Sequence, residues 1–468
     1  RDEMLSHRLH SIIVPLHRFS SAVTALDGLE ELIREPSPSS LKTQWNHLDF
    51  LVVHPRIRWG PNSPSILRDP KLQLEEAIAL IGTMPDYRVA NSVIVGTDYN
   101  TKKARLWGEG RLHELVGLKE ESRATAVMIN VDRLTPRQQS ELHAIFGCPI
   151  FDRFNLVLSI FSLFARDEVA RLQIALAQVP YLRQRLNRLR TEDSSVLLPC
   201  WSGHAVVQTE DELRMREQWL RKRLSEAVEK EKKEREKNTM RGSSIAVVGY
   251  TNAGKTSLIK RLTGSASLRP LNRLFATLHT SEHSARLPSG RVVTLADTIG
   301  FLYDLPLDLL AAFEATLAHV VQAEVVVHIR DVSHPDWKAQ NEEVENTLDR
   351  LGLDEEKRRH RVITVDNKID KGGSSGDEKT WRISCKNGEG VRELISEMDR
   401  AVRERSGARG RMIALPFHSK SIQYLYSEGF VVDEPETTET HLKFIVNMTD
   451  EEFERFKSHS NEMRRLNK

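Results

Sequence analysis

The chain has 468 residues, enough for about three domains, and its content of 39% hydrophobic and 29% charged residues is ordinary for a soluble protein with buried cores. The net charge of +2 excludes binding to nucleic acid through global charge, so any basic surface has to be local. No apolar run reaches the roughly 18 residues that a membrane span needs, so we expect none. The spacing of Cys148, Cys200 and Cys385 argues against a disulfide framework or a zinc site and favours a reducing compartment.

Residues 1–47 have the composition of a targeting segment followed by a linker. The run Met4–Leu26 carries two arginines and several serines, and the first acidic residue after it is Asp27. This composition is typical of a mitochondrial transit peptide and predicts a location in the mitochondrial matrix. An ordinary amphipathic N-terminal segment is the alternative interpretation. Glu35–Ser40 contains prolines and serines, which predict a linker.

Residues 48–165 alternate between strand and helix patterns. The helix spacing is clearest in Leu72–Ile81, whose apolar residues fall at positions 74, 77, 78 and 81. Alternation of this kind predicts a small parallel α/β domain. The expected strands are Leu51–Val53, Val89–Val95, Thr125–Val131 and Ile150–Phe151, and the expected helices are Leu72–Ile81, Arg111–Leu118, Pro136–Phe146 and Leu156–Ala165.

Residues 166–240 have the pattern of a helical arm. Two amphipathic helices are expected at about Glu168–Arg190 and Asp211–Lys237, and the segment between them contains serine, proline and glycine. Two such helices can fold back on each other as an antiparallel coiled coil.

The end of the first arm helix is rich in arginine, and two hypotheses account for it. In the first, these side chains lie near the tip of the arm and contact the phosphate backbone of RNA. In the second, they pair with the acidic residues at the start of the second helix. The arginines are Arg183, Arg185, Arg188 and Arg190, and the acidic residues are Glu210, Asp211, Glu212 and Glu217.

Residues 241–403 contain a phosphate-binding pattern. The strand-like run Ile245–Val248 is followed by G-x-x-x-x-G-K-T and then by the helical pattern Ser257–Leu262. Glycines let backbone N–H groups surround a phosphate, Lys255 reaches the β- and γ-phosphates, and Thr256 offers its hydroxyl to Mg²⁺. The candidate nucleotide contacts in this loop are Gly249, Tyr250, Thr251, Asn252, Ala253, Gly254, Lys255, Thr256 and Ser257.

Two further motifs complete the expected phosphate and metal site. The strand pattern Val292–Ala296 ends in Asp297, which can hold the metal through water, and Gly300 can bring its N–H to the γ-phosphate. Between these motifs, Phe275 and Thr277 belong to a loop in which the threonine can bind Mg²⁺ when γ-phosphate is present. The candidate catalytic residues are Lys255, Thr277 and Gly300, and the candidate metal ligands are Thr256, Thr277 and Asp297.

The next motifs have the pattern of a guanine-binding site. The strand pattern Val362–Val365 leads to Asn367, Lys368 and Asp370, and the carboxylate of Asp370 can accept both the ring N–H and the amino group of guanine. After the strand-like run Trp381–Ile383, a second loop suits the edge of the base and contains Ser384, Cys385 and Lys386. Five motifs in this order predict a GTP-binding domain of the P-loop class.

Residues 411–468 predict a small C-terminal α/β domain. We see no catalytic pattern in it, so a scaffold or docking role is the default interpretation. The expected strands are Met412–Pro416, Phe430–Val432 and His441–Val446, and the expected helices are Ser419–Ser427 and Asp450–Lys457.

Several of these motifs resemble the HflX-type GTPases, and within that family the animal mitochondrial members. The resemblance covers about residues 48–400 and is carried by GYTNAGKT at 249–256, LFATL at 274–278, DTIGFL at 297–302, Phe151-Asp152-Arg153 and the run Ala170–Leu182. It implies an α/β fold with an N-terminal α/β domain, a helical arm, a Ras-like GTPase domain and a small C-terminal domain. It also implies Mg²⁺-dependent GTP hydrolysis.

The resemblance further implies binding to the mitochondrial large ribosomal subunit and its rRNA. The corresponding role is late assembly of that subunit, or dissociation and recycling of ribosomes. We expect no DNA partner and a monomer away from the ribosome. The competing hypotheses are a nucleotide-gated RNA-binding module with incidental hydrolysis and a tRNA-modification GTPase, which shares the Asn-Ala-Gly-Lys loop. The C-terminal cysteine motif of that second group is absent from the sequence.

Two residues of the GTP site predict unusual chemistry. Phe301 occupies the position in which many GTPases have a glutamine that orients the attacking water, and a phenylalanine ring cannot do so. We therefore expect slow basal turnover and completion of the site by a partner. Asn252 lies where potassium-dependent GTPases of similar motif place a cation ligand, so K⁺ is a candidate cofactor; the alternative is that Asn252 only braces the loop.

Overall fold

The structure, a computed structural model, describes residues 47–57, 69–97, 103–165, 167–189, 196, 209–238, 243–265, 274–275, 281–302, 317, 320–373, 376–377 and 379–466. The expected transit segment and linker lie outside these described residues, and so do Thr277, Arg190 and Cys200. Within the described residues, no helix is both long and apolar enough to cross a membrane.

The first sheet has four parallel strands in the order β2-β1-β3-β4. Successive residues of its strand β1 face opposite sides: Phe50 packs with helices α2 and α5, whereas Leu51 packs with α3 and α4. Helices on both sides explain why the middle of β1 and all of β3 are buried, and the sheet is the parallel one that the sequence predicted. The elements are β1 (Leu48–Ile57), α2 (Pro70–Ile81), β2 (Tyr87–Thr97), α3 (Glu109–Glu121), β3 (Ala126–Ile129), α4 (Pro136–Phe146), β4 (Ile150–Phe151) and α5 (Arg153–Phe164).

Local capping signals fix where these helices begin. Helix α4 starts with a capping box between Thr135 and Gln138 and ends at Gly147, which has a left-handed φ of 63°. The side chain of Asp152 accepts from the backbone N–H of Asn155 at 2.8 Å and so caps α5. The predicted bounds of α4 agree with the structure because these signals are local.

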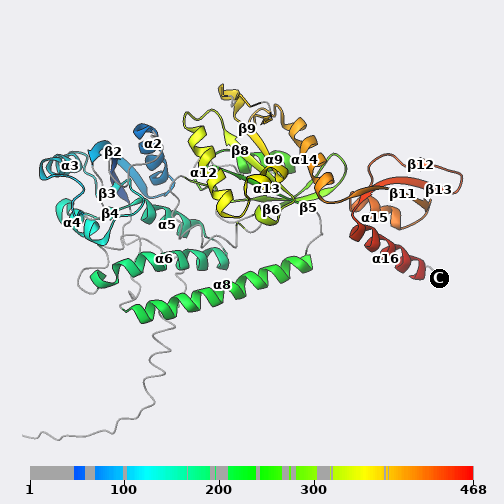
Figure 1. Ribbon diagram of the computed structural model, residues 1–468, viewed down its shortest axis with the longest axis horizontal. Helices are drawn as coiled ribbons and strands as arrows, with labels where there is room; N and C mark the ends of the chain where they lie inside the picture. Colours follow the sequence, from blue (N-terminus) through cyan, green and yellow to red (C-terminus); the bar gives the residue numbers. More distant parts are fainter. Residues whose placement is uncertain are drawn as a thin grey trace, which may run out of the picture.

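The arm consists of α6 (Glu168–Leu189) and α8 (Glu210–Asn238), which lie side by side below the first two sheets in Figure 1. Ion pairs show that the helices are antiparallel. Arg183, near the end of α6, pairs with Glu210 at the start of α8, whereas Glu168, at the start of α6, pairs with Arg223 further along α8. The predicted antiparallel pair of helices is therefore present.

The structure contradicts an RNA contact for one arm arginine, Arg185, and pairs another, Arg183, with acidic residues of α8. Arg183 pairs with Glu210 at 3.0 Å and with Glu217 at 2.7 Å, which is the alternative that the sequence left open. Arg185 is completely buried, and its guanidinium lies 3.3 Å from the ring centre of Tyr181. It also donates to the carbonyl of Leu134 at 2.9 Å. The cluster of charges in the sequence did not reveal that one member is enclosed by the N-terminal sheet and its helices.

The second sheet has six strands in the order β10-β9-β8-β5-β7-β6, and all neighbouring pairs are parallel except β6 and β7. The elements are β5 (Ser243–Gly249), α9 (Lys255–Thr263), β6 (Ser281–Arg286), β7 (Val292–Asp297), β8 (Val325–Asp331), α12 (Trp337–Arg350), α13 (Glu355–Arg361), β9 (Val362–Asn367), the 3-10 turn η1 (Ile369–Lys371), β10 (Trp381–Arg382) and α14 (Val391–Arg405). The predicted GTP-site motifs follow β5, β7, β9 and β10. Because the carboxyl ends of parallel strands meet at one edge of a sheet, these motifs converge there.

The third sheet is antiparallel and has the order β11-β13-β12. The expected strand Phe430–Val432 is reduced to a single bridge between Val431 and Val446, and backbone hydrogen bonds on either side of it join Val432 to Ile445 and Phe430 to Asn447. Two acids and Pro435 follow, and because proline lacks an N–H it interrupts pairing along β13. The elements are β11 (Arg409–Pro416), α15 (Ser421–Ser427), β12 (Glu436–Thr437), β13 (His441–Met448) and α16 (Asp450–Leu466).

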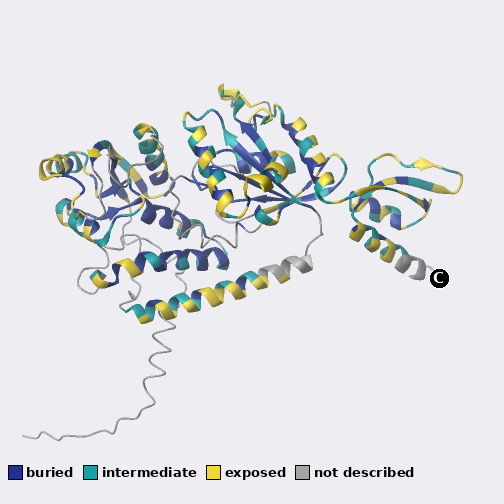
Figure 2. Cartoon of the chain, viewed as in Figure 1, coloured by how far each residue is buried: buried dark blue, intermediate teal, exposed yellow. Residues whose placement is uncertain are grey.

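The third sheet is attached to the hairpin that joins β6 and β7. Arg291, at the base of the hairpin, forms a buried ion pair with Glu452 of α16 at 2.7 Å. Gly429 has a φ of 69°, and a Cβ there would lie 1.7 Å from the carbonyl oxygen of Gly290, so only glycine fits. Figure 2 shows that buried residues concentrate in the sheets and in α6, whereas α8 is largely exposed.

We predict that Arg185→Ala lowers the free energy of unfolding by about 3–5 kcal/mol, because it leaves the buried Asp152 without one of its positive neighbours. The control is Arg183→Ala, whose side chain is 40% exposed and should change stability by less than about 1 kcal/mol. Denaturant titration of both variants checks the difference. Equal losses would contradict the assigned burial of Arg185.

Candidate functional site

Two glycines let the loop after β5 turn tightly. A Cβ on Gly249, whose φ is 155°, would lie 2.3 Å from the carbonyl oxygen of Ile329. A Cβ on Gly254, whose φ is 109°, would lie 2.2 Å from the side-chain nitrogen of Asn367. Gly254 also precedes α9, so the free N–H groups at the start of that helix face the loop. This is an anion-binding cradle.

Lys255 is buried inside the cradle. Its Nζ donates to the carbonyl oxygens of Gly249 at 3.2 Å and Tyr250 at 3.0 Å. Burial lowers the pKa of the Lys255 amine to about 8, and the nearby Asp297 raises it in part. A bound phosphate would replace these neutral carbonyl oxygens with charged ones, which are stronger partners for the amine.

Thr256 and Asp297 form a donor set that suits a magnesium ion. The Thr256 hydroxyl donates to Oδ2 of Asp297 at 2.7 Å, so the two side chains are already adjacent. Asp297 is 1% exposed at the end of β7. A hydroxyl and one carboxylate fit Mg²⁺, which prefers oxygen ligands and keeps several waters.

The loop after β7 lies directly on the phosphate cradle. The backbone N–H of Thr251 donates to the carbonyl of Phe301 at 2.7 Å, and the N–H of Phe301 donates to the carbonyl of Gly249 at 3.2 Å. A Cβ on Gly300 would lie 3.0 Å from Nζ of Lys255. A γ-phosphate between Lys255 and Gly300 therefore requires this loop to move away from the cradle.

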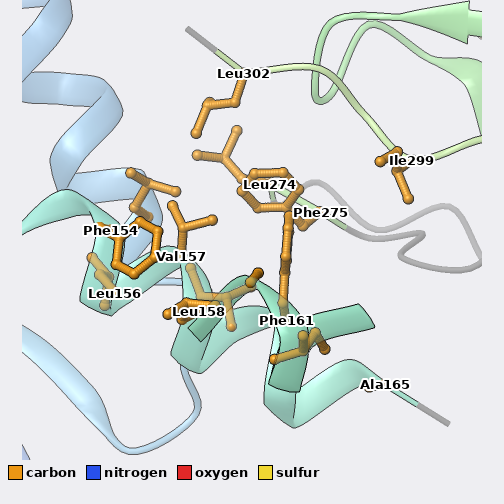
Figure 3. Packing of buried hydrophobic residues seen from close by; sticks show 14 of the residues in the cluster. Phe154, Leu156, Val157, Leu158, Phe161, Ala165, Leu274, Phe275, Ile299 and Leu302 are labelled. Carbon is orange, nitrogen blue, oxygen red and sulfur yellow. The ribbon is translucent and has the colours of Figure 1, made fainter. Parts of the chain in front are cut away.

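The loop after β7 and the segment Leu274–Phe275 pack against the N-terminal unit, by which we mean the first sheet and its helices α2 to α5. Leu274, Phe275, Ile299 and Leu302 belong to one hydrophobic cluster with residues of α5 (Figure 3). Phe301 belongs to the same cluster. The rings of Phe275 and Phe161 lie edge to face, with their centres 4.7 Å apart. Burying each such side chain contributes about 1.5–3 kcal/mol. The free energy needed to move these loops therefore depends on their packing against α5.

A polar contact joins the cradle to the N-terminal unit as well. The hydroxyl of Tyr250 donates to Oε2 of Glu76, on α2, at 2.6 Å. The other carboxylate oxygen of Glu76 pairs with Arg153 at the start of α5. Glu76 could not be identified from the sequence, because it has the pattern of an ordinary surface acid of an amphipathic helix.

The loop after β9 is connected to the phosphate cradle. The side chain of Asn367 donates to the carbonyl of Ala253 at 2.8 Å and accepts from the N–H of Cys385 at 3.0 Å. Nζ of Lys368 donates to the carbonyl of Asn252 at 2.9 Å. These bonds hold the base-edge loops and the phosphate loop in one rigid arrangement.

Asp370 is prepared to accept hydrogen bonds from a base. The Ser384 hydroxyl donates to its Oδ1 at 2.6 Å and lowers the pKa of the carboxyl, so Asp370 is ionised at neutral pH. Ser384 Oγ also accepts from the N–H of Lys386 at 3.3 Å. A fixed, ionised carboxylate is suited to the two adjacent N–H donors of guanine.

The structure thus gathers nearly all the sequence-predicted residues at one edge of the second sheet. Ser257 lies in the first turn of α9, and Phe275 turns its ring into the hydrophobic cluster. Thr277, the expected third metal ligand, lies outside the described residues. The cradle, the hydroxyl–carboxylate pair and the base-edge loops define a P-loop GTP-binding domain.

Comparison with known proteins agrees with this class. A family model described as "50S ribosome-binding GTPase" matches residues 244–368, and one described as "GTP-binding GTPase N-terminal" matches residues 71–162. The chain is 36% identical to "Putative GTP-binding protein 6" of Homo sapiens, over 81% of this chain and 75% of that protein.

The chain is also similar to bacterial proteins that are named GTPase HflX. The chain is 35% identical to "GTPase HflX" of Caldanaerobacter subterraneus, over 71% of this chain and 78% of that protein, and 33% identical to that of Magnetococcus marinus, over 72% and 80%. The chain therefore belongs to the HflX family and is a GTP-hydrolysing enzyme, as the resemblance implied.

We predict that Asp370→Asn weakens GTP binding at least about a hundredfold and gives the protein affinity for xanthosine triphosphate. The reason is that xanthine has a carbonyl in the place of the amino group of guanine, and the asparagine side chain can donate to that carbonyl. Competition binding with both nucleotides checks this. The control is Asp433→Asn, which changes an exposed carboxyl between α15 and β12 and should alter neither affinity. Equal ATP and GTP affinity in the unmodified protein would contradict the role of Asp370.

We predict that GTP affinity falls as the pH rises from 7 to 9. The nucleotide-free Lys255 amine has a pKa of about 8, so above that pH it is neutral and has to take up a proton before it can bind the phosphates. Above that pH the affinity for GTP should fall by about tenfold per pH unit, because one proton is taken up for each GTP bound. Calorimetry in buffers of different ionisation enthalpy should detect that proton uptake. A constant affinity over this range would contradict the prediction.

Proposed function

We propose that this GTPase acts on the mitochondrial large ribosomal subunit, in late assembly or in ribosome dissociation and recycling. The observation that carries the proposal is the shared hydrophobic cluster between α5 and the nucleotide loops, since it links the state of the nucleotide to the position of the N-terminal unit. The family model that matches residues 244–368 is described as ribosome-binding, which supports this choice of partner.

Two features support the mitochondrial compartment. The composition of Met4–Leu26 is typical of a transit peptide. The relatives include animal proteins, from Homo sapiens and Xenopus laevis, over 81% and 89% of this chain. We also propose that the protein is a monomer away from the ribosome and that its RNA partner is rRNA.

The geometry supports a division of labour in the GTP site. Lys255 and the N–H of Gly300 would neutralise charge on the phosphoryl group that is transferred, and Thr256, Asp297 and Thr277 would hold Mg²⁺, which supplies further positive charge. Asn367, Lys368, Asp370 and Ser384 would hold the base. Lys255, the N–H of Gly300 and Mg²⁺ would place positive or donor groups where negative charge develops, whereas Asp370 would accept the N–H donors of the base.

Basal hydrolysis should be slow, because the position of the usual glutamine is filled by Phe301, which is 1% exposed. A particle that moves the loops around Gly300 and Thr277 would raise turnover. K⁺ is a second candidate contributor. Asn252 is exposed in the cradle and has a φ of 62°, a conformation that asparagine tolerates, so its backbone is fixed beside the phosphate site.

We predict that the protein co-sediments with mitochondrial large subunits when it carries a non-hydrolysable GTP analogue, and much less when it carries GDP. The nucleotide-dependent movement of the loops on α5 is the physical reason. Small subunits are the control. Equal binding in both nucleotide states, or binding only to small subunits, would contradict the proposal.

We predict that particle-stimulated turnover is at least about tenfold higher in K⁺ than in Na⁺, because a cation of suitable size adds positive charge at the phosphates. Asn252→Gly keeps the backbone conformation and removes the side chain, so it should abolish the difference. If the unmodified protein turns over equally in both salts, the cation proposal fails and Asn252 only braces the loop.

A further inference from the structure

The attacking water has no side-chain partner at the position where many GTPases have glutamine. The ring of Phe301 belongs to the hydrophobic cluster on α5, so the side chain faces an apolar core and offers no polar atom. Hydrolysis nevertheless needs a group that orients water in line with the γ-phosphorus. Such a group has to lie next to Phe301.

Thr251 is the neighbour of this position in the phosphate cradle. Its N–H donates to the carbonyl of Phe301 at 2.7 Å. A Cβ on Gly300 would lie 2.7 Å from Cγ2 of Thr251 and 3.0 Å from Nζ of Lys255, so both side chains approach the same point. The Thr251 side chain thus lies beside the amine that is placed to bind the γ-phosphate.

The hydroxyl of Thr251 is buried and unpaired. The residue is 6% exposed, and its Oγ1 makes no hydrogen bond within the part of the chain that the structure describes. Nearby hydroxyls are paired: Thr256 donates to Asp297 and Thr298 to the carbonyl of Val247, both at 2.7 Å. Native proteins rarely leave a buried hydroxyl without a partner, so this one indicates a partner that arrives with the substrate.

We propose that Thr251 is a positioning residue for hydrolysis. Its hydroxyl accepts a hydrogen bond from the attacking water and donates a hydrogen bond to a γ-phosphate oxygen. The water oxygen forms a bond to the γ-phosphorus, the bond from that phosphorus to the β–γ bridging oxygen breaks, and GDP leaves. The water proton ends on the released phosphate, and Thr251 remains chemically unchanged.

This proposal concerns the GTPase reaction of the isolated protein and does not depend on the ribosomal role. The test is Thr251→Val, which keeps the shape of the side chain and its contact with Gly300 but lacks the hydroxyl. We expect the rate constant of hydrolysis in single-turnover assays at saturating GTP to fall at least about tenfold, with the GDP affinity within about twofold of the original. Thr251→Ser restores a hydroxyl and should recover most of the rate.

The matched control is Thr263→Val at the end of α9, where the hydroxyl donates to the carbonyl of Ile259 and lies outside the site. Its kcat should be unchanged. A second measurement is the affinity for GDP with aluminium fluoride, which mimics the transferring phosphoryl group and its attacking water. Thr251→Val should weaken that complex by the same factor as kcat.

A purely structural role would lower nucleotide affinity and melting temperature together with the rate and leave the preference for the fluoride complex intact. That result would overturn the proposal. It would also be overturned if Thr251→Val kept its rate, or if Thr251→Ser were as slow as Thr251→Val.

Discussion

The contact between α5 and the loops of the GTP site is the interaction on which the rest of the arrangement depends. Phe161 on α5 packs edge to face on Phe275, and Leu274, Ile299 and Leu302 belong to the same hydrophobic cluster (Figure 3). These are the loops that have to respond to a γ-phosphate. Their apolar side chains are buried against another part of the chain, so the N-terminal unit helps to set the free energy of each loop position.

Polar contacts on both sides of the GTPase sheet reinforce this arrangement. Tyr250 of the phosphate cradle bonds to Glu76, and Glu76 pairs with Arg153. On the far side, the ion pair between Arg291 and Glu452 attaches the third sheet to the hairpin between β6 and β7. The hairpin leads from one nucleotide loop to the other. Both loops are therefore held by elements outside the GTPase sheet.

The nucleotide motifs could be predicted because their chemistry is local. Gly249 and Gly254 belong to a short motif and have φ values of 155° and 109°, which side chains other than glycine rarely adopt, and Asp370 precedes a loop whose composition suits a base edge. The helix caps of the N-terminal unit are equally local. The predicted alternation of strand and helix gave the first sheet for the same reason.

Features that depend on distant contacts could not be predicted. Arg185 and Arg183 look alike in the sequence, yet one is enclosed beside Tyr181 and the other pairs with α8. Glu76 lies 174 residues from Tyr250.

The most direct test of the central claim is the nucleotide preference of Phe161→Ala, measured as the ratio of affinities for a non-hydrolysable GTP analogue and GDP. The variant removes a ring from the hydrophobic cluster that holds Phe275 together with Ile299 and Leu302, so the loop after β7 should leave the phosphate cradle more easily. We predict that the ratio shifts at least about fivefold towards the GTP analogue, while Leu163→Ala, on the exposed side of the same helix, leaves it unchanged. An unchanged ratio in a folded Phe161→Ala protein would contradict the coupling.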